Sequence, residues 1–215
     1  MSAAARQIPK GNRNKKELRM QKIPTLFKRE FDAEHRKRIT REVTEGCECV
    51  LEGRAVPTLK WDGAACAIIG GEIYKRYDAK QKYGKKPPEG AIPCQESPDP
   101  ITGHWPHWVE VDLNAPADKW FAEALRNTFE NMDNLPDGYR TYEAVGKHFN
   151  GNPYGLERDI LIPHGGDVVD VERSFEGIKR FLDENDDVEG LVFWRNGKPK
   201  CKIKRSDFGL PWNRG

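Results

Sequence analysis

The segment Pro57-Thr58-Leu59-Lys60-Trp61-Asp62-Gly63 places one lysine on an otherwise apolar approach, with an acid two residues later and then a glycine. Proline enters a strand only at its edge or its start, and glycine allows a tight turn after the acid. The next stretch, Ala64 to Gly70, is small and apolar, which is typical of a buried strand. We therefore expect Lys60 near the end of one strand, directed to the core side of a sheet, with Asp62 beside it. A lysine in such a place needs a partner or a chemical role.

The composition predicts one sizeable domain with a basic N-terminal arm. The chain has 215 residues, of which 37% are hydrophobic and 33% charged, enough for one core and short for two. The first 41 residues contain 13 Lys and Arg against four Asp and Glu, whereas the rest contains 23 against 30. A basic arm on an acidic body indicates a polyanionic partner such as nucleic acid, although a solvated tail without a partner would have the same composition. We expect residues 1–20 to be a disordered tail and residues 21–215 to form the domain.

The five cysteines favour a reducing compartment. Their number is odd and no two are spaced as C-x-x-C, which argues against a disulfide framework. Cys47 and Cys49, taken with His104 and His107, match no standard zinc spacing. No apolar run approaches the roughly 20 residues of a membrane span. We expect a cytoplasmic, monomeric protein that does not contact a membrane.

The hydrophobic pattern predicts an α+β chain with an antiparallel sheet core. Residues 117–132 show a helical period, and Ser174 is a typical N-cap for a second helix. Asn196-Gly197 is a strong hairpin signal between the last two predicted strands. The predicted strands are residues 23–31, 39–50, 55–60, 64–69, 72–77, 139–145, 159–162, 189–194 and 199–205.

Residues 81–118 are rich in proline and show no period, which predicts an irregular insertion. Trp105 and Trp108 lie within it. These two tryptophans could stack on nucleic-acid bases, but loop tryptophans more often fasten a loop to the core, and we favour that interpretation.

Charged residues on predicted strands form a separate signal. Each of them alone is most simply a solvent-facing side chain, because charged residues are mostly exposed. Lys202 and Lys204 alternate with Cys201 and Ile203, so both lysines face the same side of their strand. The whole set combines cations, which suit a triphosphate, with acids, which suit a divalent metal and a ribose. Its members are Lys60, Asp62, Arg76, Glu143, Glu189, Lys202 and Lys204.

The order of these residues resembles the motifs of the covalent nucleotidyltransferases, which include DNA ligases, RNA ligases and mRNA capping enzymes. Five segments match in order: Lys60-Trp-Asp-Gly63, Lys75-Arg76-Tyr-Asp78, Thr141-Tyr-Glu143-Ala-Val-Gly146, Val188-Glu189-Gly190-Leu-Val and Lys202-Ile-Lys204. Other stretches are similar to the vertebrate ATP-dependent 5′-to-3′ RNA ligase family: Gln21-Lys-Ile-Pro, Asn150-Gly-Asn-Pro-Tyr-Gly-Leu156, Leu161-Ile-Pro-His-Gly165 and Gly209-Leu-Pro-Trp212. The resemblance covers about residues 21–212. It implies the antiparallel-sheet nucleotidyltransferase (adenylyltransferase) domain of the ligase and capping-enzyme type.

The resemblance implies a covalent reaction at Lys60. This lysine would take AMP from ATP as a phosphoramidate, and Asp62 would orient the lysine or the substrate end. Lys202 and Lys204 would hold the α-phosphate and help to expel pyrophosphate. Neighbouring cations and a hydrated metal disfavour the charge of a lysine, which is a known way to activate its amine.

The resemblance also implies a nucleotide and metal site. Arg76 would hold the ribose or a phosphate, and Glu143 would bind the ribose. Glu143 and Glu189 would position Mg²⁺ or Mn²⁺ with its waters. Thr58 and Leu59 would line the same nucleotide site, and Leu59 stands where many relatives have a glutamate that reads the adenine amino group.

Three functions remain open at this point. The first is an RNA ligase that joins 5′-phosphate and 3′-hydroxyl ends through lysyl-AMP and an adenylylated 5′ end. The second is a DNA ligase or a capping-type transferase that uses GTP. The third is a non-catalytic RNA-binding module, although such a module should have lost some of the seven polar residues, and none is missing.

Overall fold

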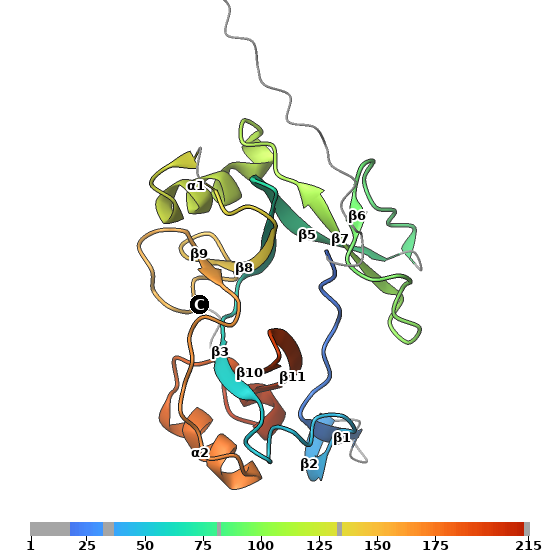
Figure 1. Ribbon diagram of the computed structural model, residues 1–215, viewed down its shortest axis with the longest axis vertical. Coiled ribbons are helices and arrows are strands. Elements are labelled where there is room, and N and C mark those ends of the chain that lie inside the picture. The colour runs from blue at the N-terminus through green and yellow to red at the C-terminus, as the bar shows by residue number, and fades with distance from the viewer. Residues whose placement is uncertain (1–17, 32–36, 81–82, 133–134, 213–215) are drawn as a thin grey trace, which may run out of the picture.

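The computed structural model describes residues 18–31, 37–80, 83–132 and 135–212. Within these ranges the chain forms three antiparallel sheets and two α-helices (Figure 1), so the predicted α+β class is confirmed. Most of the predicted tail, residues 1–17, lies outside the described residues. No helix in the described ranges is long and apolar enough to cross a bilayer.

The larger sheet occupies the upper half of Figure 1 and has the strand order β6-β7-β5-β4-β8-β9. One face of its central strands packs under helix α1, where Ile68 and Tyr142 meet Leu125. On the opposite face, Ala67 and Ile69 of β4 are buried in a second cluster. The elements are β4 (Ala64–Ile69), β5 (Glu72–Lys80), β6 (Ile92–Pro93), β7 (His104–Glu110), β8 (Tyr139–Val145), β9 (Ile160–Pro163), η2 (Pro116–Asp118) and α1 (Lys119–Thr128).

The smaller sheet has three strands in the order β11-β10-β3, and helix α2 covers its core face. Ser174 caps α2 by accepting a hydrogen bond from Gly177 N, as its sequence predicts. The predicted hairpin turn is also confirmed, because Asn196 and Gly197 both have positive φ. The elements are β3 (Val56–Lys60), α2 (Phe175–Glu184), β10 (Gly190–Arg195), β11 (Lys198–Lys204) and η4 (Arg205–Phe208).

A two-stranded ribbon, β1 (Phe27–Phe31) and β2 (Lys37–Val43), packs beside the smaller sheet. The ring of Phe27 lies 4.9 Å from that of Phe175 in α2. The predicted strand 39–50 is too long: the chain turns after Val43, where Gly46 has a positive φ.

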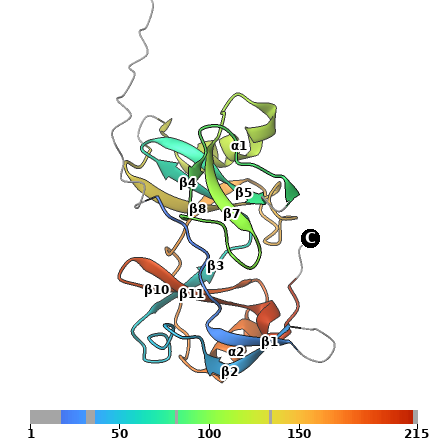
Figure 2. The same cartoon turned by 90° about the vertical axis from the view of Figure 1, so that its right-hand side faces the viewer.

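The chain crosses between the two sheets at Asp62-Gly63, and both views show one sheet above the other (Figures 1 and 2). The expectation that Lys60 faces the core side is wrong. Leu59 packs into the core, so Lys60 points to the opposite face of the small sheet, which we call the site face. At the crossing, a Cβ added to Gly63 would lie 2.1 Å from the carbonyl oxygen of Ala144, so only glycine fits.

The segment predicted as an irregular insertion contains strand β7, which pairs with β5 in the larger sheet. Its prolines concealed an otherwise strand-like stretch of aromatic residues. Trp108 is fully buried, and its Nε1 donates to Leu18 O at 3.1 Å. Trp105 Nε1 donates to Gln95 O at 3.0 Å. The interpretation that these tryptophans fasten the segment to the core is therefore confirmed for Trp108, whereas Trp105 bonds within the segment itself.

Candidate functional site

One carboxylate joins two lysines on the site face. Glu189 Oε2 accepts a hydrogen bond from Lys60 Nζ at 2.5 Å, and Glu189 Oε1 accepts one from Lys204 Nζ. The Glu189 side chain is only 3% exposed, against 20% for Lys60 and 27% for Lys204. A buried carboxylate with two ammonium partners is well compensated, and the two lysines are held close together.

The register of the three strands explains this arrangement. Gly190 in the central strand is the partner of Lys60 on one side and of Lys204 on the other. Cross-strand partners point to the same face, so the two lysines lie on either side of a residue without a side chain. A Cβ added to Gly190 would lie 2.2 Å from the carbonyl oxygen of Ile203. Glycine is therefore required here, and it leaves room between the lysines.

Lys202 and Thr58 extend the site face by one row. Lys202 and Thr58 are the two partners of Val192, so they lie on the same face as Lys60 and Lys204. Burial lowers the pKa of Lys202 to about 8, and the neighbouring positive charges of Lys60 and Lys204 add to the effect. The Thr58 hydroxyl donates to Val192 O and accepts from the indole N–H of Trp194 at 3.0 Å.

Asp62 is held rigidly at the crossing between the sheets. Its carboxylate accepts from Asn150 Nδ2 at 2.9 Å and from Trp212 Nε1 at 2.8 Å. Its backbone N–H donates to Tyr154 Oη at 2.5 Å. Burial raises the pKa of Tyr154 above its usual range, so that hydroxyl stays neutral. The acid two residues after Lys60 is thus buried and fixed in direction.

Glu143 and Arg76 share a face of the larger sheet but have different partners. Glu143 Oε1 accepts from Gly63 N at 3.0 Å, and Glu143 Oε2 lies 2.9 Å from His164 Nε2. Arg76 instead donates to Asp78 at 3.3 Å. Glu143 is therefore tied to the crossing next to Asp62, whereas Arg76 pairs within its own strand.

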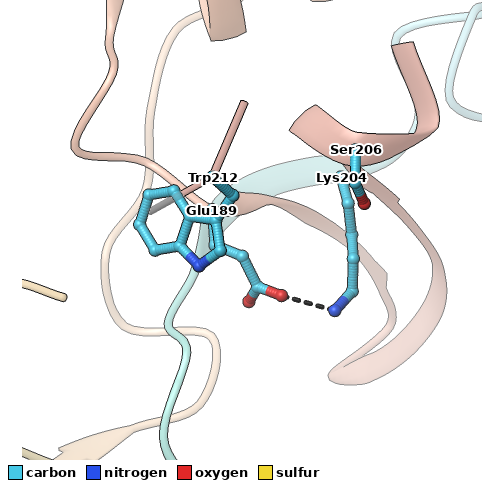
Figure 3. A pocket seen from close by; sticks show the side chains of 4 residues that line it. All are labelled: Glu189, Lys204, Ser206 and Trp212. Atoms are coloured by element: carbon cyan, nitrogen blue, oxygen red, sulfur yellow. Dashed lines mark hydrogen bonds and ion pairs between the residues drawn. The ribbon is translucent and has the colours of Figure 1, made fainter. Parts of the chain in front are cut away.

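A cavity of about 280 Å³ opens beside the paired lysine and glutamate (Figure 3). Glu189, Lys204, Ser206 and Trp212 line it, and Figure 3 shows the Lys204 ammonium directed at the Glu189 carboxylate. Trp212 in the C-terminal segment thus lines the same cavity as the charged side chains of Glu189 and Lys204.

The structure brings together most of the predicted site residues. Lys60, Lys202 and Lys204 lie on the small sheet, and Glu189 directly precedes β10. Asp62 lies at the crossing, where Glu143 binds the next residue, Gly63. Leu59 packs its side chain into the core and reaches the site face only through its backbone.

Four polar or aromatic residues at the site were not predicted by residue type alone: Asn150, Tyr154, His164 and Trp212. All four lie in loops, where no period marks a buried side chain. The only signal was their place in the three stretches similar to RNA ligases. Their long-range hydrogen bonds show why those stretches carry polar and aromatic residues.

The acidic residues of the site do not form a metal cage in the part of the chain that the structure describes. Among the described residues, no three His, Cys, Asp or Glu side chains converge on one point. Mg²⁺ usually keeps several waters and binds one or two carboxylates together with substrate phosphates. Both oxygens of Glu189 bind lysines, and those of Glu143 contact Gly63 N and His164, so the predicted metal role of Glu143 and Glu189 stays a prediction.

Chemically, the site places a primary amine among fixed cations and carboxylates. An amine at this position could attack an electrophilic phosphorus or carbonyl atom, and the neighbouring lysines would stabilise the charge that develops. The crossing residues would align the reacting groups.

Two curated proteins resemble the chain, and no protein-family model matches it. It is 29% identical over 167 residues to RNA ligase 1 of Pongo abelii, which covers 60% of this chain and 50% of that protein. It is 23% identical over 256 aligned positions to RNA ligase 1 of Rattus norvegicus, covering 95% of this chain and 77% of the relative. The first match therefore spans about half the length of that relative. The similarity to RNA ligases predicted from the motifs is confirmed, as a distant relationship.

Proposed function

We propose that this distant relative of the RNA ligases is an ATP-dependent RNA ligase of the nucleotidyltransferase fold. It would join 5′-phosphate and 3′-hydroxyl RNA ends through a lysyl-AMP intermediate. The observation that carries the proposal is the row Lys60–Gly190–Lys204 with the shared Glu189 carboxylate. We propose RNA and not DNA as the substrate because both relatives are named RNA ligase 1.

In the first step, Lys60 Nζ attacks the α-phosphorus of ATP. A nitrogen–phosphorus bond forms, the bond to pyrophosphate breaks, and the amine releases a proton to water. Glu189 is the nearest carboxylate to that amine and directs it. Lys202 and Lys204 stabilise the charge on the α-phosphate oxygens and on the leaving pyrophosphate.

The crossing residues would position the nucleotide. Glu143, fixed by Gly63 and His164, would bind the ribose, and Arg76 would reach the ribose or a phosphate. Glu143 and Glu189 would hold Mg²⁺ or Mn²⁺, which neutralises phosphate charge when bound. Because the Leu59 side chain faces the core, its backbone and other groups would select the base.

In the later steps, AMP passes from Lys60 to the 5′-phosphate of an RNA end. A 3′-hydroxyl then attacks that phosphate and displaces AMP, which seals the strand. Asp62 would orient the ends, since its carboxylate direction is fixed by Asn150 and Trp212. The basic arm remains a predicted contact with the RNA backbone.

The test is transfer of label from α-labelled ATP to the protein in the presence of Mg²⁺. We expect label on the wild type and none on Lys60→Ala or Lys60→Arg. Lys198→Ala is the matched control, because Lys198 is an exposed lysine at the start of β11. Label that persists in both Lys60 variants would reject the covalent mechanism.

Two further arms separate the alternatives. Label taken from α-labelled GTP and not from ATP would favour a capping-type transferase. Sealing of nicked DNA and not of RNA would favour a DNA ligase. An unlabelled wild type that still binds RNA would favour a non-catalytic binding module.

A further inference from the structure

A second cavity also borders Trp212. Its volume is about 310 Å³, at the lower end of the range of small-ligand pockets, so it suits one planar ring system and not a whole nucleotide. Trp212 lines both cavities, so the second one adjoins the space beside Glu189 and Lys204 (Figure 3). The residues that line it are Pro153, Asp186, Asp187, Arg205, Pro211 and Trp212.

Arg205 is a buried cation in this wall. It is only 3% exposed, and among the described residues no carboxylate forms an ion pair with it. Its Nε donates to Pro211 O at 2.8 Å, and its Nη1 donates to the carbonyl oxygens of Leu182 and Asn185. These carbonyl groups hold the guanidinium in one orientation.

The second terminal nitrogen of Arg205 is still available. Nη2 has no hydrogen-bond partner in the described part of the chain. It is also not closed off from solvent, so it faces the cavity that its residue lines. An arginine that served only to bind the end of α2 would need only its Nε and Nη1 contacts. The N–H groups on Nη2 remain for a ligand with an acceptor atom.

Two carboxylates line the same cavity. Asp186 and Asp187 are exposed in the turn between α2 and β10, and no described residue forms a hydrogen bond or an ion pair with either side chain. Ionised carboxylates only accept hydrogen bonds. They would repel a phosphate, and the Arg205 guanidinium would repel a metal ion. The wall therefore suits an uncharged group that has both donors and an acceptor.

We propose that this cavity binds a guanine base of the RNA end, stacked on Trp212; that the base belongs to an RNA end rests on the proposed ligase function. Guanine presents two neighbouring donors, N1–H and the 2-amino group, beside one carbonyl acceptor. Asp186 and Asp187 match the donors, and Arg205 Nη2 matches the acceptor. Each of the other three bases has a single donor group on this edge. Stacking on an aromatic ring combined with hydrogen bonds to the Watson–Crick edge is the usual recognition of single-stranded RNA.

The test is the binding of two single-stranded RNAs that differ by one amino group, measured by titration calorimetry without ATP or Mg²⁺. The probes are 5′-phosphorylated RNAs of six nucleotides with guanosine or inosine at one end, and inosine lacks only the 2-amino group. The wild type should bind the guanosine RNA about tenfold more tightly, as expected for one hydrogen bond to a charged group.

The double variant Asp186→Ala/Asp187→Ala should bind the two RNAs with equal affinity, because the acceptors are removed. The matched control is Asp183→Ala/Glu184→Ala, which removes two exposed acids at the end of α2 and should keep the tenfold difference. Loss of negative charge strengthens the binding of both RNAs alike, so the ratio of the two affinities reports on the base contact alone.

The position of the guanosine identifies the strand. A difference seen when guanosine is the first nucleotide assigns the cavity to the 5′-phosphate end. A difference seen when it is the last nucleotide assigns the cavity to the 3′-hydroxyl end.

Equal affinities of the wild type for guanosine and inosine RNA at both ends, no measurable binding of either RNA, or a difference that persists in Asp186→Ala/Asp187→Ala would overturn the guanine site. The measurement needs no covalent step. A wild type that distinguishes the two RNAs but takes no label from ATP would reject the ligase and leave the base site standing. A wild type that takes label but does not distinguish them would reject the base site alone.

Discussion

The two sheets hold their charged residues in different ways. On the small sheet, Lys202 and Lys204 of β11 share a face with Lys60 of β3, and Glu189 is the acid beside them. On the larger sheet, Glu143 is tied by hydrogen bonds to the crossing segment and to His164. The first arrangement concentrates positive charge in a partly buried place, whereas the second fixes a carboxylate in one direction. On the proposed function, the small sheet would carry the chemistry and the larger sheet would align the substrate.

The largest effect on stability and on self-labelling is expected when the shared acid, Glu189, is removed. Glu189→Gln keeps the volume of the side chain but leaves Lys60 and Lys204 without their carboxylate. Breaking a buried ion pair typically costs about 3–5 kcal/mol. We expect the free energy of unfolding to fall by about 3 kcal/mol and self-labelling to drop at least about a hundredfold.

Urea unfolding and the label assay measure these two effects, with Glu184→Gln as the control because Glu184 is exposed at the end of α2. Labelling within twofold of wild type would show that the shared acid does not direct the lysine.

The positive charge on the small sheet should also make the free energy of unfolding depend on pH. Burial is the main reason that the pKa of Lys202 falls from 10.5 to about 8, and the groups facing it are Lys60, Lys204, Arg29 and Glu189. Between these two values the unfolded chain binds more protons than the folded one, so this group makes stability rise with pH. At pH 7 both states are protonated and the folded state carries the whole penalty.

We therefore expect Lys202→Met to be more stable than wild type at pH 7, by on the order of 1–3 kcal/mol. The gap should shrink as the pH rises from 7 towards 10. Urea unfolding across that range measures it, and Lys198→Met, at an exposed position, should show no such trend. A gap independent of pH would mean that Lys202 is not destabilised by its charge.

A substitution on the larger sheet should instead change the binding of substrate. His164→Ala removes one of the two partners of Glu143. If Glu143 aligns the nucleotide, the KM for ATP in self-labelling should rise about tenfold with little change in the maximal rate, because uniform binding is lost. A double-mutant cycle with Glu143→Gln should show coupling, since the two side chains are in contact. Additive effects would show that His164 does not help to align Glu143.

The sequence predicts features that are encoded within one segment. The alternation of Lys202 and Lys204 with Cys201 and Ile203 predicts their common face, and Asn196-Gly197 predicts the hairpin that pairs β11 with β10. The charged set also predicts most of the site, since four of its members share the small sheet.

Long-range packing could not be predicted in the same way. Only three residues separate β3 from β4, yet these strands belong to different sheets, because Gly63 passes against Ala144 of β8. For the same reason the predicted direction of the Lys60 side chain was wrong. The pattern shows that Leu59 and Lys60 face opposite sides of the strand, but it does not show which side is the core. The partners of Asp62 come from loops far along the chain, and no local period marks them.

The mildest test concerns the junction between the two sheets. Trp212→Phe removes the indole N–H that donates to Asp62 but keeps an aromatic ring at this position, where the Trp212 ring lies 5.9 Å from that of Tyr154. Asn150 still donates to the other carboxylate oxygen, so the acid stays in place with more freedom. We expect only about a threefold loss in self-labelling, because the hydrogen bond from Asn150 to the carboxylate remains.

Sealing of nicked RNA should fall further than self-labelling if Asp62 orients the RNA ends and not Lys60. Equal losses in both assays would instead indicate that Asp62 orients Lys60. Because Asp62 lies at the crossing, the ratio of the two losses decides whether it acts with the small sheet, where AMP would be attached, or with the larger sheet, where the substrate would be aligned.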